Sequence, residues 1–281
     1  MNPIPIAITG ATGGIGGLVA RKLSSLSIPQ RLLVRTPSKA PQLPNTTVHQ
    51  CSYTDPAASA TALKYTHTLF MVSASESADR LSQHRAFIDA AVSAGIQHIV
   101  YTSYIAAAPD AIFTLARDHY ATEEYIKSSG MRWTFLRDSM YIDFVESLVG
   151  ADGVIRGPAG SGRVAIVARE DVARLAAAVL AAPDAHVGKT YDVTGREALS
   201  MADMAAAVAK ARSRDVGFYD ESVEEAYASR EVYGVEEWQV EAWVSTYTAV
   251  GSGVLAGVSD AVERVTGRAP MTLGEYLAAD S

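Results

Sequence analysis

Residues 8–23 read ITGATGGIGGLVARKL, a short apolar run joined to a helix-like stretch through a loop rich in glycine. Gly10, Gly13 and Gly16 stand three residues apart in this loop. Gly10 permits a tight turn, Gly13 lets backbone N–H groups approach a pyrophosphate, and the amino terminus of the following helix favours negative charge. Because a second strand-like run follows about twenty residues on, the sequence predicts a dinucleotide-binding site.

Strand-like and helix-like segments alternate through the first half of the chain. The internal strand-like runs are almost continuously apolar, as strands buried on both faces of a sheet should be. They lie at 5–9, 31–35, 46–50, 67–72, 97–103 and 132–137. The helix-like segments begin at Gly13 and after Asp55, and two more span 78–94 and 110–129. This alternation predicts an α/β fold of the Rossmann type, with a doubly wound parallel sheet.

The pattern changes after about residue 138. The expected elements are a helix over 138–150, loop and short strands over 153–167, a helix over 169–182 capped by Asp171, a strand over 189–195, and mainly helices from Ser200 onward. We therefore expect a nucleotide-binding Rossmann domain over 1–138 with a return segment over about 164–195. A smaller, mainly helical substrate lobe is expected over about 139–163 and 196–281, covering the carboxyl ends of the strands, where ligands of such sheets bind.

Composition and charge exclude several classes of protein. The 281 residues carry a net charge of -7 and no basic run, which argues against a nucleic-acid surface. Cys51 is the single cysteine, so no internal disulfide is possible and a reducing compartment is favoured. The first residues lack the pattern of a signal peptide, no apolar stretch is long enough to span a membrane, and no metal-ligand spacing is present. We therefore expect a cytoplasmic protein without a metal site, acting as a monomer or homodimer on a small-molecule substrate.

The end of the second strand-like run indicates which dinucleotide is bound. A site that prefers NAD usually offers a carboxylate to the ribose 2′-hydroxyl, whereas LLVRTPSKA offers Arg35 and Lys39 and no acid. A guanidinium can pair with a 2′-phosphate through two hydrogen bonds, and a carboxylate would repel it. We therefore predict NADP(H) as the cofactor.

Several motifs in one order resemble the NmrA-like branch of the atypical short-chain dehydrogenases/reductases, and within it the bacterial NAD(P)H:quinone oxidoreductases. They are TGATGGIGG, LLVRTPSKA, QHRAFIDAAVSAGIQHIVYTS, ARDHYATEEYIKSSGMRWTFLRDSMYIDF and GPAGSGRVAIVAREDVA. The resemblance implies that the cofactor contacts Gly10, Ala11, Thr12, Gly13, Gly14, Ile15, Arg35, Ser73, Ala74 and Ser75. It also places Asp138, Met140, Tyr141 and Asp143 near the nicotinamide and the substrate.

The usual catalytic pair of short-chain dehydrogenases is missing from the sequence. Those enzymes carry a Tyr four residues before a Lys on a helix, and here Leu115 and His119 stand at the expected positions. Quinone reduction needs less, because an electron-poor ring accepts hydride from a stacked nicotinamide and then needs a proton. The candidate donors are His119, Tyr104 and Tyr141. Glu123 stands four residues after His119 on the same helix face, so we expect it to orient the imidazole or to raise its pKa.

Each of these candidates also has a structural interpretation. His119 can be a surface histidine in a pair with Glu123, and Tyr104 and Tyr141 can be aromatic residues lining a pocket. Arg137 and Asp138 can form an ion pair with each other rather than contact a substrate.

Three functions fit the sequence. The first is an NADPH-dependent oxidoreductase that transfers hydride to a quinone or a similar conjugated electrophile. The second is a non-catalytic NADP(H)-binding redox sensor of the NmrA type, which acts through a protein partner. The third is an imine, enone or dye reductase on the same scaffold. Fold-level analogy does not choose among them, and the resemblance favours the first.

Overall fold

The computed structural model describes residues 4–279, which form two compact units. The first unit holds the chain up to Ser103, Asp118–Arg137 and Glu170–Tyr191, and the second holds Tyr104–Arg117, Asp138–Arg169 and the chain from Asp192 onward. The sequence pattern groups residues 104–117 with the first lobe, whereas the structure groups them with the second unit. Boundaries of this kind depend on long-range packing, which a local pattern does not contain.

A seven-stranded sheet in the order β3-β2-β1-β4-β5-β6-β8 carries the fold. Its strands are β1 (Ile6–Thr9), β2 (Gln30–Val34), β3 (Thr46–Gln50), β4 (Thr68–Met71), β5 (His98–Tyr104), β6 (Arg132–Asp138) and β8 (Lys189–Val193). The predicted Rossmann-type parallel sheet is confirmed, because every pairing from β3 across to β5 is parallel. The near-continuous apolar runs are explained by burial, since all residues of β1 and all but the last of β5 are buried.

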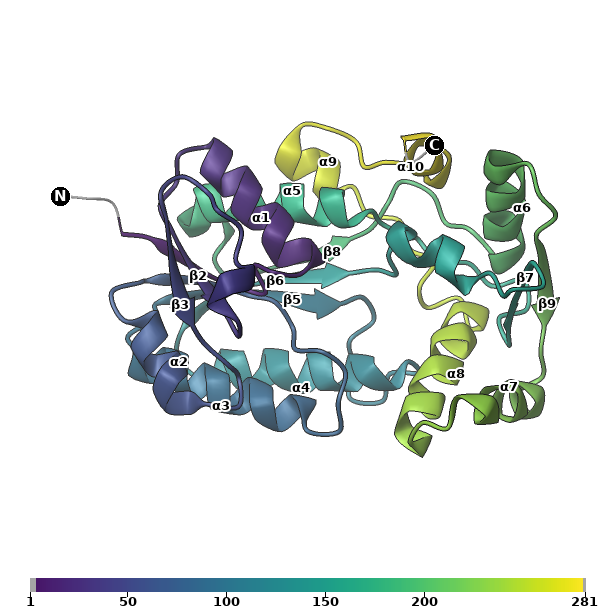
Figure 1. The fold of residues 1–281 in the computed structure, drawn as a ribbon, viewed down its shortest axis with the longest axis horizontal. Helices are drawn as coiled ribbons and strands as arrows, with labels where there is room; N and C mark the ends of the chain where they lie inside the picture. Colours follow the sequence, from purple (N-terminus) through teal and green to yellow (C-terminus); the bar gives the residue numbers. More distant parts are fainter. Residues whose placement is uncertain (1–3, 280–281) are drawn as a thin grey trace. The chain divides into compact units, whose positions relative to one another are not determined.

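Helices cover the sheet on both faces. They are α1 (Gly14–Ser25), α2 (Pro56–Leu63), α3 (Arg80–Ser93), α4 (Thr114–Ser128) and α5 (Arg169–Ala181). Figure 1 shows α1 and α5 on one face of the sheet and α2, α3 and α4 on the other. Helix α1 packs through Val19, Ala20 and Leu23, which have no exposed surface. Within residues 4–279, no helix has the length and apolar character needed to cross a membrane.

The strand order reverses at β1, which pairs with β2 on one side and with β4 on the other. Ile8 lies opposite Leu32 of β2 and Phe70 of β4. In open α/β sheets, ligands bind outside the carboxyl ends of the strands at such a reversal, because the loops diverge there and leave a crevice. The fold therefore directs attention to the residues that follow β1, β2 and β4.

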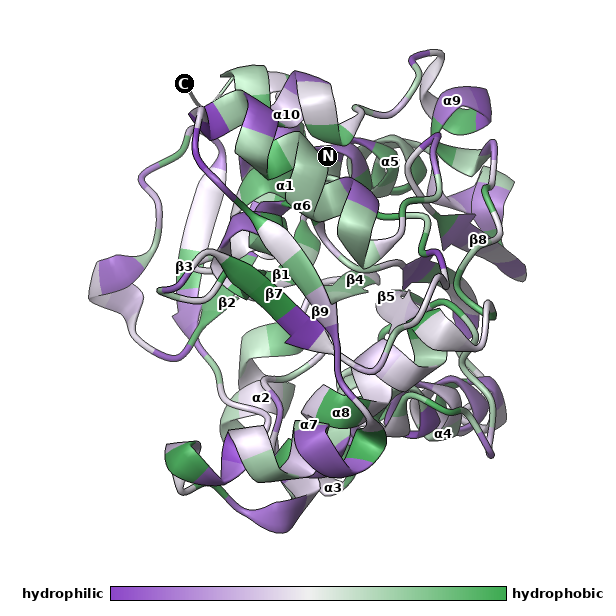
Figure 2. Ribbon diagram, turned by 90° about the vertical axis from the view of Figure 1, so that its right-hand side faces the viewer, coloured by the Kyte–Doolittle hydropathy of each residue, from purple (hydrophilic) through white to green (hydrophobic). Residues whose placement is uncertain are grey.

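The second unit contains a small sheet and the C-terminal helices. Its elements are the 3₁₀ helix η2 (Ile142–Leu148), β7 (Val154–Gly157), α6 (Met201–Arg212), β9 (Gly217–Asp220), α7 (Val223–Arg230), α8 (Glu237–Gly251), α9 (Ala261–Thr266) and α10 (Leu273–Ala279). Figure 2 shows β7 and β9 side by side, and they pair in parallel from Val154 opposite Gly217. The helix expected over 138–150 is thus a shorter 3₁₀ helix, and β9 interrupts the region expected to be mainly helical.

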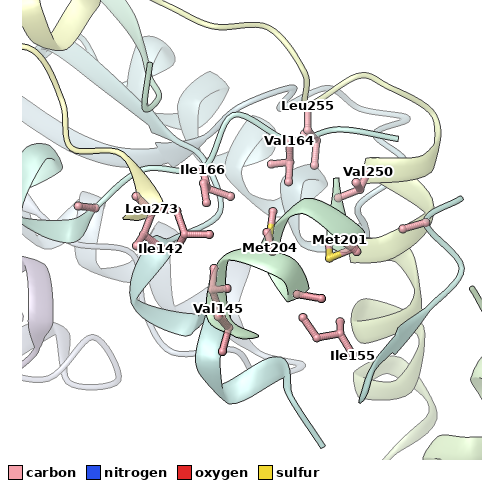
Figure 3. Packing of buried hydrophobic residues seen from close by; sticks show 14 of the residues in the cluster. Ile142, Val145, Ile155, Val164, Ile166, Met201, Met204, Val250, Leu255 and Leu273 are labelled. Atoms are coloured by element: carbon pink, nitrogen blue, oxygen red, sulfur yellow. The ribbon is translucent and has the colours of Figure 1, made fainter. Parts of the chain in front are cut away.

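The core of the second unit is aliphatic. Ile142, Val145, Ile155, Met201 and Met204 pack together as shown in Figure 3, and each is at most 2% exposed. These residues come from η2, β7 and α6, so one cluster joins segments that are distant in sequence. Full burial of such side chains contributes about 1.5–3 kcal/mol each, so this cluster stabilises the unit.

We predict that Gly16→Ala destabilises the protein. A Cβ at Gly16 would lie 2.4 Å from the carbonyl oxygen of Gly10 and 2.6 Å from that of Thr9. These are backbone atoms in the β1–α1 connection, so relief requires moving the helix from the sheet, and we expect a loss of about 2 kcal/mol or more. Thermal and urea unfolding would measure it. Gly217→Ala is the control, because nothing lies within 4 Å of its Cβ position; equal stability losses in both variants would refute the prediction.

Candidate functional site

The glycine loop exposes the amino terminus of α1. Gly10 has a φ of 64°, a conformation that side chains disfavour, and its carbonyl oxygen accepts a hydrogen bond of 2.8 Å from the N–H of Gly13. Gly13 caps α1 without a side-chain hydrogen bond, and no acidic residue stands in the first turn. The first N–H groups of the helix thus remain available to an anion, and the helix dipole favours one.

A cavity of about 500 Å³ opens in the first unit in front of this loop. Its lining includes nine residues predicted to contact the cofactor: Gly10, Thr12, Gly13, Gly14, Ile15, Arg35, Ser73, Ala74 and Ser75. Two others do not line it: Ala11 is 2% exposed and faces the core, and Lys39 ends the short 3₁₀ helix η1 (Pro37–Lys39). The cavity therefore lies where the strand order reverses, among the segments that follow β1, β2 and β4.

The loop after β2 supplies a positive charge to this cavity. Arg35 follows the last residue of β2, lines the cavity and is exposed. No acidic side chain forms an ion pair with Arg35 in the part of the chain that the structure describes. A dinucleotide fits these residues, since the helix end can bind a pyrophosphate and the guanidinium can pair with a ribose phosphate.

Tyr53 also lines the cavity, and the sequence analysis missed it. Its hydroxyl oxygen lies 2.7 Å from Oγ1 of Thr9 and 2.6 Å from the carbonyl oxygen of Val72. The N–H of Val72 donates to the same Thr9 hydroxyl at 2.8 Å. Tyr53 thus joins the ends of β1 and β4. A single tyrosine in a loop gives no periodic signal that reveals such a contact.

A buried histidine holds the segment from Ser73 to Ser75. The backbone N–H of Ala74 donates to Nε2 of His84 at 2.9 Å, and Nδ1 of the same ring lies 2.9 Å from Oγ1 of Thr122. Because Nε2 accepts, the proton is assigned to Nδ1. Burial, and to a smaller extent the nearby charge of Arg80, lowers the pKa of His84 to about 3. The imidazole is therefore neutral over the physiological range.

His119 lies in a similar buried network. It is 6% exposed, its Nε2 lies 2.7 Å from Nη2 of Arg80, and its Nδ1 lies 3.0 Å from the hydroxyl of Tyr101. A guanidinium only donates, so Nε2 is an acceptor. Burial and the charge of Arg80 hold the pKa of His119 well below its usual value. These contacts do not favour His119 as a proton donor, and the alternative of a surface histidine is wrong.

Glu123 pairs with Arg137. The sequence spacing instead predicts that Glu123 pairs with His119 and that Arg137 pairs with Asp138. The carboxylate of Glu123 accepts from Nε of Arg137 at 2.8 Å and from Nη2 at 2.6 Å, and Ser103 donates to it at 2.6 Å. The acid is fully buried, so this two-point pairing compensates its charge. Arg137 therefore pairs across the fold rather than with its neighbour Asp138, and the raised histidine pKa expected from Glu123 is not found.

A second cluster of ionisable groups lies in the second unit, at the end of β6. The hydroxyl of Tyr141 donates to Oδ2 of Asp138 at 2.8 Å, and Asp138 is 1% exposed. Within the described residues, Oδ1 of Asp138 has no hydrogen-bond partner. Burial raises the pKa of Asp138 to about 8. Burial and the Asp138 charge also raise the pKa of Tyr104 and of Tyr141, which places these three predicted residues in one electrostatic cluster.

Asp143 is engaged at the start of α5. Oδ2 of Asp143 accepts from the N–H of Arg169 at 3.0 Å and so caps α5, which the sequence analysis assigned to Asp171. Asp171 is instead buried in the first turn of α5 and pairs with Arg174.

Met140 lines a cavity in the second unit. No group of three His, Cys, Asp or Glu residues suited to a metal ion occurs in residues 4–279.

The sequence model of an NAD(P)H-binding family matches residues 10–183, which include the whole glycine loop and all but one of the residues that line its cavity. The chain belongs to this family. The resemblance to bacterial NAD(P)H:quinone oxidoreductases is confirmed, and this NAD(P)H-binding chain is an oxidoreductase that depends on NAD(P)H.

Similar proteins cover nearly the full length of the chain. Quinone oxidoreductase 2 of Escherichia coli (strain K12) is 32% identical over 277 residues, and an NAD(P)H azoreductase of Xenophilus azovorans is 31% identical over 276, with 96% of each chain covered. The crystal structure of the E. coli NADPH-dependent quinone oxidoreductase with NADPH has a TM-score of 0.88, 31% identity and coverage of 98% and 99%. Triphenylmethane reductase of Citrobacter sp. has a TM-score of 0.86 and 30% identity, covering 99% and 100%.

We predict that Arg35→Ala raises the dissociation constant for NADPH about 10- to 100-fold, because a charge-assisted contact to the 2′-phosphate is lost. The constant for NADH should change less than about 3-fold, since it has no such phosphate. Calorimetric titration of both cofactors tests this. Lys39→Ala is the matched control, because Lys39 lies near Arg35 but does not line the cavity. An equal loss for NADPH and NADH would contradict the assignment of Arg35.

We predict that His84 makes the protein less stable as the pH falls. The unfolded histidine takes up a proton below its usual pKa of 6.5, and the folded one does so only near 3. The unfolded state then binds more protons, so the unfolding free energy falls by up to about 1.4 kcal/mol per pH unit below pH 6. Urea unfolding between pH 7 and about 4.5 measures this slope.

His84→Gln keeps an acceptor for Ala74 and cannot take up the proton. The slope of unfolding free energy against pH should therefore be smaller in this variant. His67→Gln is the control, because His67 is exposed. An unchanged slope in His84→Gln would show that His84 does not carry the pH dependence.

Proposed function

We propose that this chain reduces a quinone or a similar conjugated electrophile with NADPH, without a Tyr-x-x-x-Lys pair. The proposal rests mainly on the hydrogen-bonded pair of Tyr141 and the buried Asp138, which provides an acid in place of the missing Tyr and Lys. The similar proteins support the substrate class, because their names give a quinone, an azo compound and a triphenylmethane dye as acceptors. Each of these is an extended conjugated system.

NADPH supplies the hydride to the acceptor when it is bound. Arg35 supports NADPH over NADH, since its guanidinium lines the cavity and has no carboxylate partner among the described residues. The N–H groups at the start of α1 hold the pyrophosphate, and His84 fixes the neighbouring segment through Ala74.

Asp138 supplies the proton in this proposal. Its pKa of about 8 keeps the carboxyl protonated at neutral pH. Because Oδ2 accepts from Tyr141, the carboxyl proton resides on Oδ1, the atom without a partner in the described part of the chain. The acceptor gains the hydride, and its oxygen then gains this proton, leaving NADP⁺, the reduced acceptor and the carboxylate. Tyr141 is a positioning residue, since its hydroxyl orients the carboxyl group.

The test of the proposed function is oxidation of NADPH by the purified protein with menadione, an enone, an imine and a triphenylmethane dye, with NADH in parallel. Turnover of menadione that prefers NADPH supports the proposal. Turnover of only the imine, enone or dye would assign the chain to the other reductases considered above. Tight binding of NADP(H) without any turnover would overturn the proposal and favour a sensor that acts through a protein partner.

We predict that Asp138→Asn lowers kcat for menadione at least about 10-fold, the lower range for loss of a general acid. The dissociation constant for NADPH should not change. In the parent protein, kcat should fall as the pH rises through about 8, because the acid loses its proton. The variant should lack this decline. Steady-state rates between pH 6 and about 9.5 provide the readout.

The same variant should be more stable than the parent above neutral pH. The folded carboxyl keeps its proton up to about pH 8, whereas the unfolded one loses it near 3.8, so stability decreases with rising pH across this window. Asn cannot ionise, and its amide oxygen can still accept from Tyr141. Thermal unfolding at about pH 8.5 measures the gain. A variant that loses both activity and stability would indicate a structural role for Asp138.

A further inference from the structure

The second unit contains an open cavity that is separate from the one lined by the glycine loop. Its volume is about 450 Å³, and every residue that lines it belongs to the second unit. Small-molecule sites usually have about 300–1,000 Å³ of mostly apolar space with a few polar groups. This volume suits a ligand with one or two rings, and the composition of the walls indicates which kind.

Aromatic side chains form one wall of this cavity. Helix α8 contributes Trp243 and Tyr247, which are four residues apart and so lie on one face of the helix. Tyr233, from the segment before α8, packs edge-to-face against Trp243 at 5.6 Å between ring centroids and 88° between planes. Two methionines, Met140 and Met201, also line the cavity. Aromatic rings and polarisable thioethers favour contact with the flat face of an aromatic ligand.

The charged groups of the lining are already paired. Nη1 of Arg230 donates to Oε2 of Glu221 at 2.8 Å, both side chains are at most 10% exposed, and the guanidinium lies 5.4 Å from the centre of the Tyr247 ring. Arg156 pairs with Asp152 at 2.5 Å. The lining contains no Asp, Glu, Lys or His. A charged ligand would have to break one of these pairs or stay uncompensated, whereas a neutral ring system leaves both intact.

The proposed acid, Asp138, does not itself line this cavity, but a residue close to it in sequence does. Met140 lines the cavity and lies two residues after Asp138, in the segment that the sequence resemblance associates with the substrate. We propose that this second-unit cavity binds the ring system of a neutral, planar aromatic acceptor, with Trp243 and Tyr233 as its specificity-determining residues. The role of the ligand as an acceptor rests on the proposed function, whereas its binding is tested separately.

The experiment is a titration of the full chain with menadione, a neutral bicyclic quinone, in the absence of NADPH. Tryptophan fluorescence reports binding, because a quinone near Trp243 quenches its emission. The chain has three tryptophans, Trp133, Trp238 and Trp243. Trp238→Phe is the matched control, since this residue lies on α8 without lining the cavity and bonds to Glu236.

We expect saturable quenching in the parent and in Trp238→Phe, and its loss in Trp243→Phe. Tyr233→Ala should raise the dissociation constant about 5-fold, because one aromatic contact is lost. Tyr233 is 65% exposed, so this variant should fold even if Trp243→Phe does not. An anionic analogue, 1,2-naphthoquinone-4-sulfonate, should bind at least about 10-fold more weakly than menadione.

Three outcomes would overturn the cavity assignment: quenching that does not saturate, saturable quenching that is unchanged in both Trp243→Phe and Tyr233→Ala, or tighter binding of the sulfonate. Turnover assays on the same variants separate the two proposals. Saturable binding without NADPH oxidation would leave the cavity site in place and reject the reductase function. NADPH oxidation with an unchanged KM for menadione in both variants would support the reductase function and reject the cavity as the site that binds the acceptor.

Discussion

The close approach of α1 to the end of β1 is the constraint on which the nucleotide-binding unit depends. Only a hydrogen atom fits at Gly16, because the carbonyl oxygens of Gly10 and Thr9 occupy the space where a side chain would begin. This contact sets the position of the helix, and the helix in turn directs its free N–H groups into the cavity. Arg35 and the segment after β4 reach the same cavity because β2 and β4 flank β1 in the sheet.

Neutral hydrogen-bonding groups fix the strand ends that border this cavity. Tyr53 joins Thr9 to Val72, and His84 accepts from Ala74, so the ends of β1 and β4 are fixed by groups that stay uncharged at neutral pH. Arg35 and the helix terminus attract anions, and the acidic Glu76 also lines this cavity. His119 serves the interior in the same way, as an acceptor for Arg80.

The features that could be predicted from sequence are those encoded by neighbouring residues. The glycine spacing, the apolar strands and the position of Arg35 after a strand are local patterns, and the parallel sheet follows from them. The contacts of Tyr53, His84 and Glu123 join residues between 10 and 44 positions apart, so no local spacing reveals them. The interpretation of His119 failed for the same reason. Its spacing from Glu123 suggested a surface pair, but α4 turns both side chains into the interior.

Asp138 shows a further limit of prediction from sequence, because even a partner only three residues away, Tyr141, did not reveal its chemistry. The spacing was visible in the sequence, but the burial that changes the chemistry of the acid was not. The contrast with Glu221 in the same unit is informative. Glu221 is buried and its carboxylate accepts from the guanidinium of Arg230, which makes it a structural group. Asp138 is buried with a hydroxyl donor on one oxygen and, among the described residues, none on the other. Such an arrangement costs stability, since an unpaired polar atom is kept from water. A group that is retained at this cost and can release a proton is better suited to chemistry than to holding the fold together.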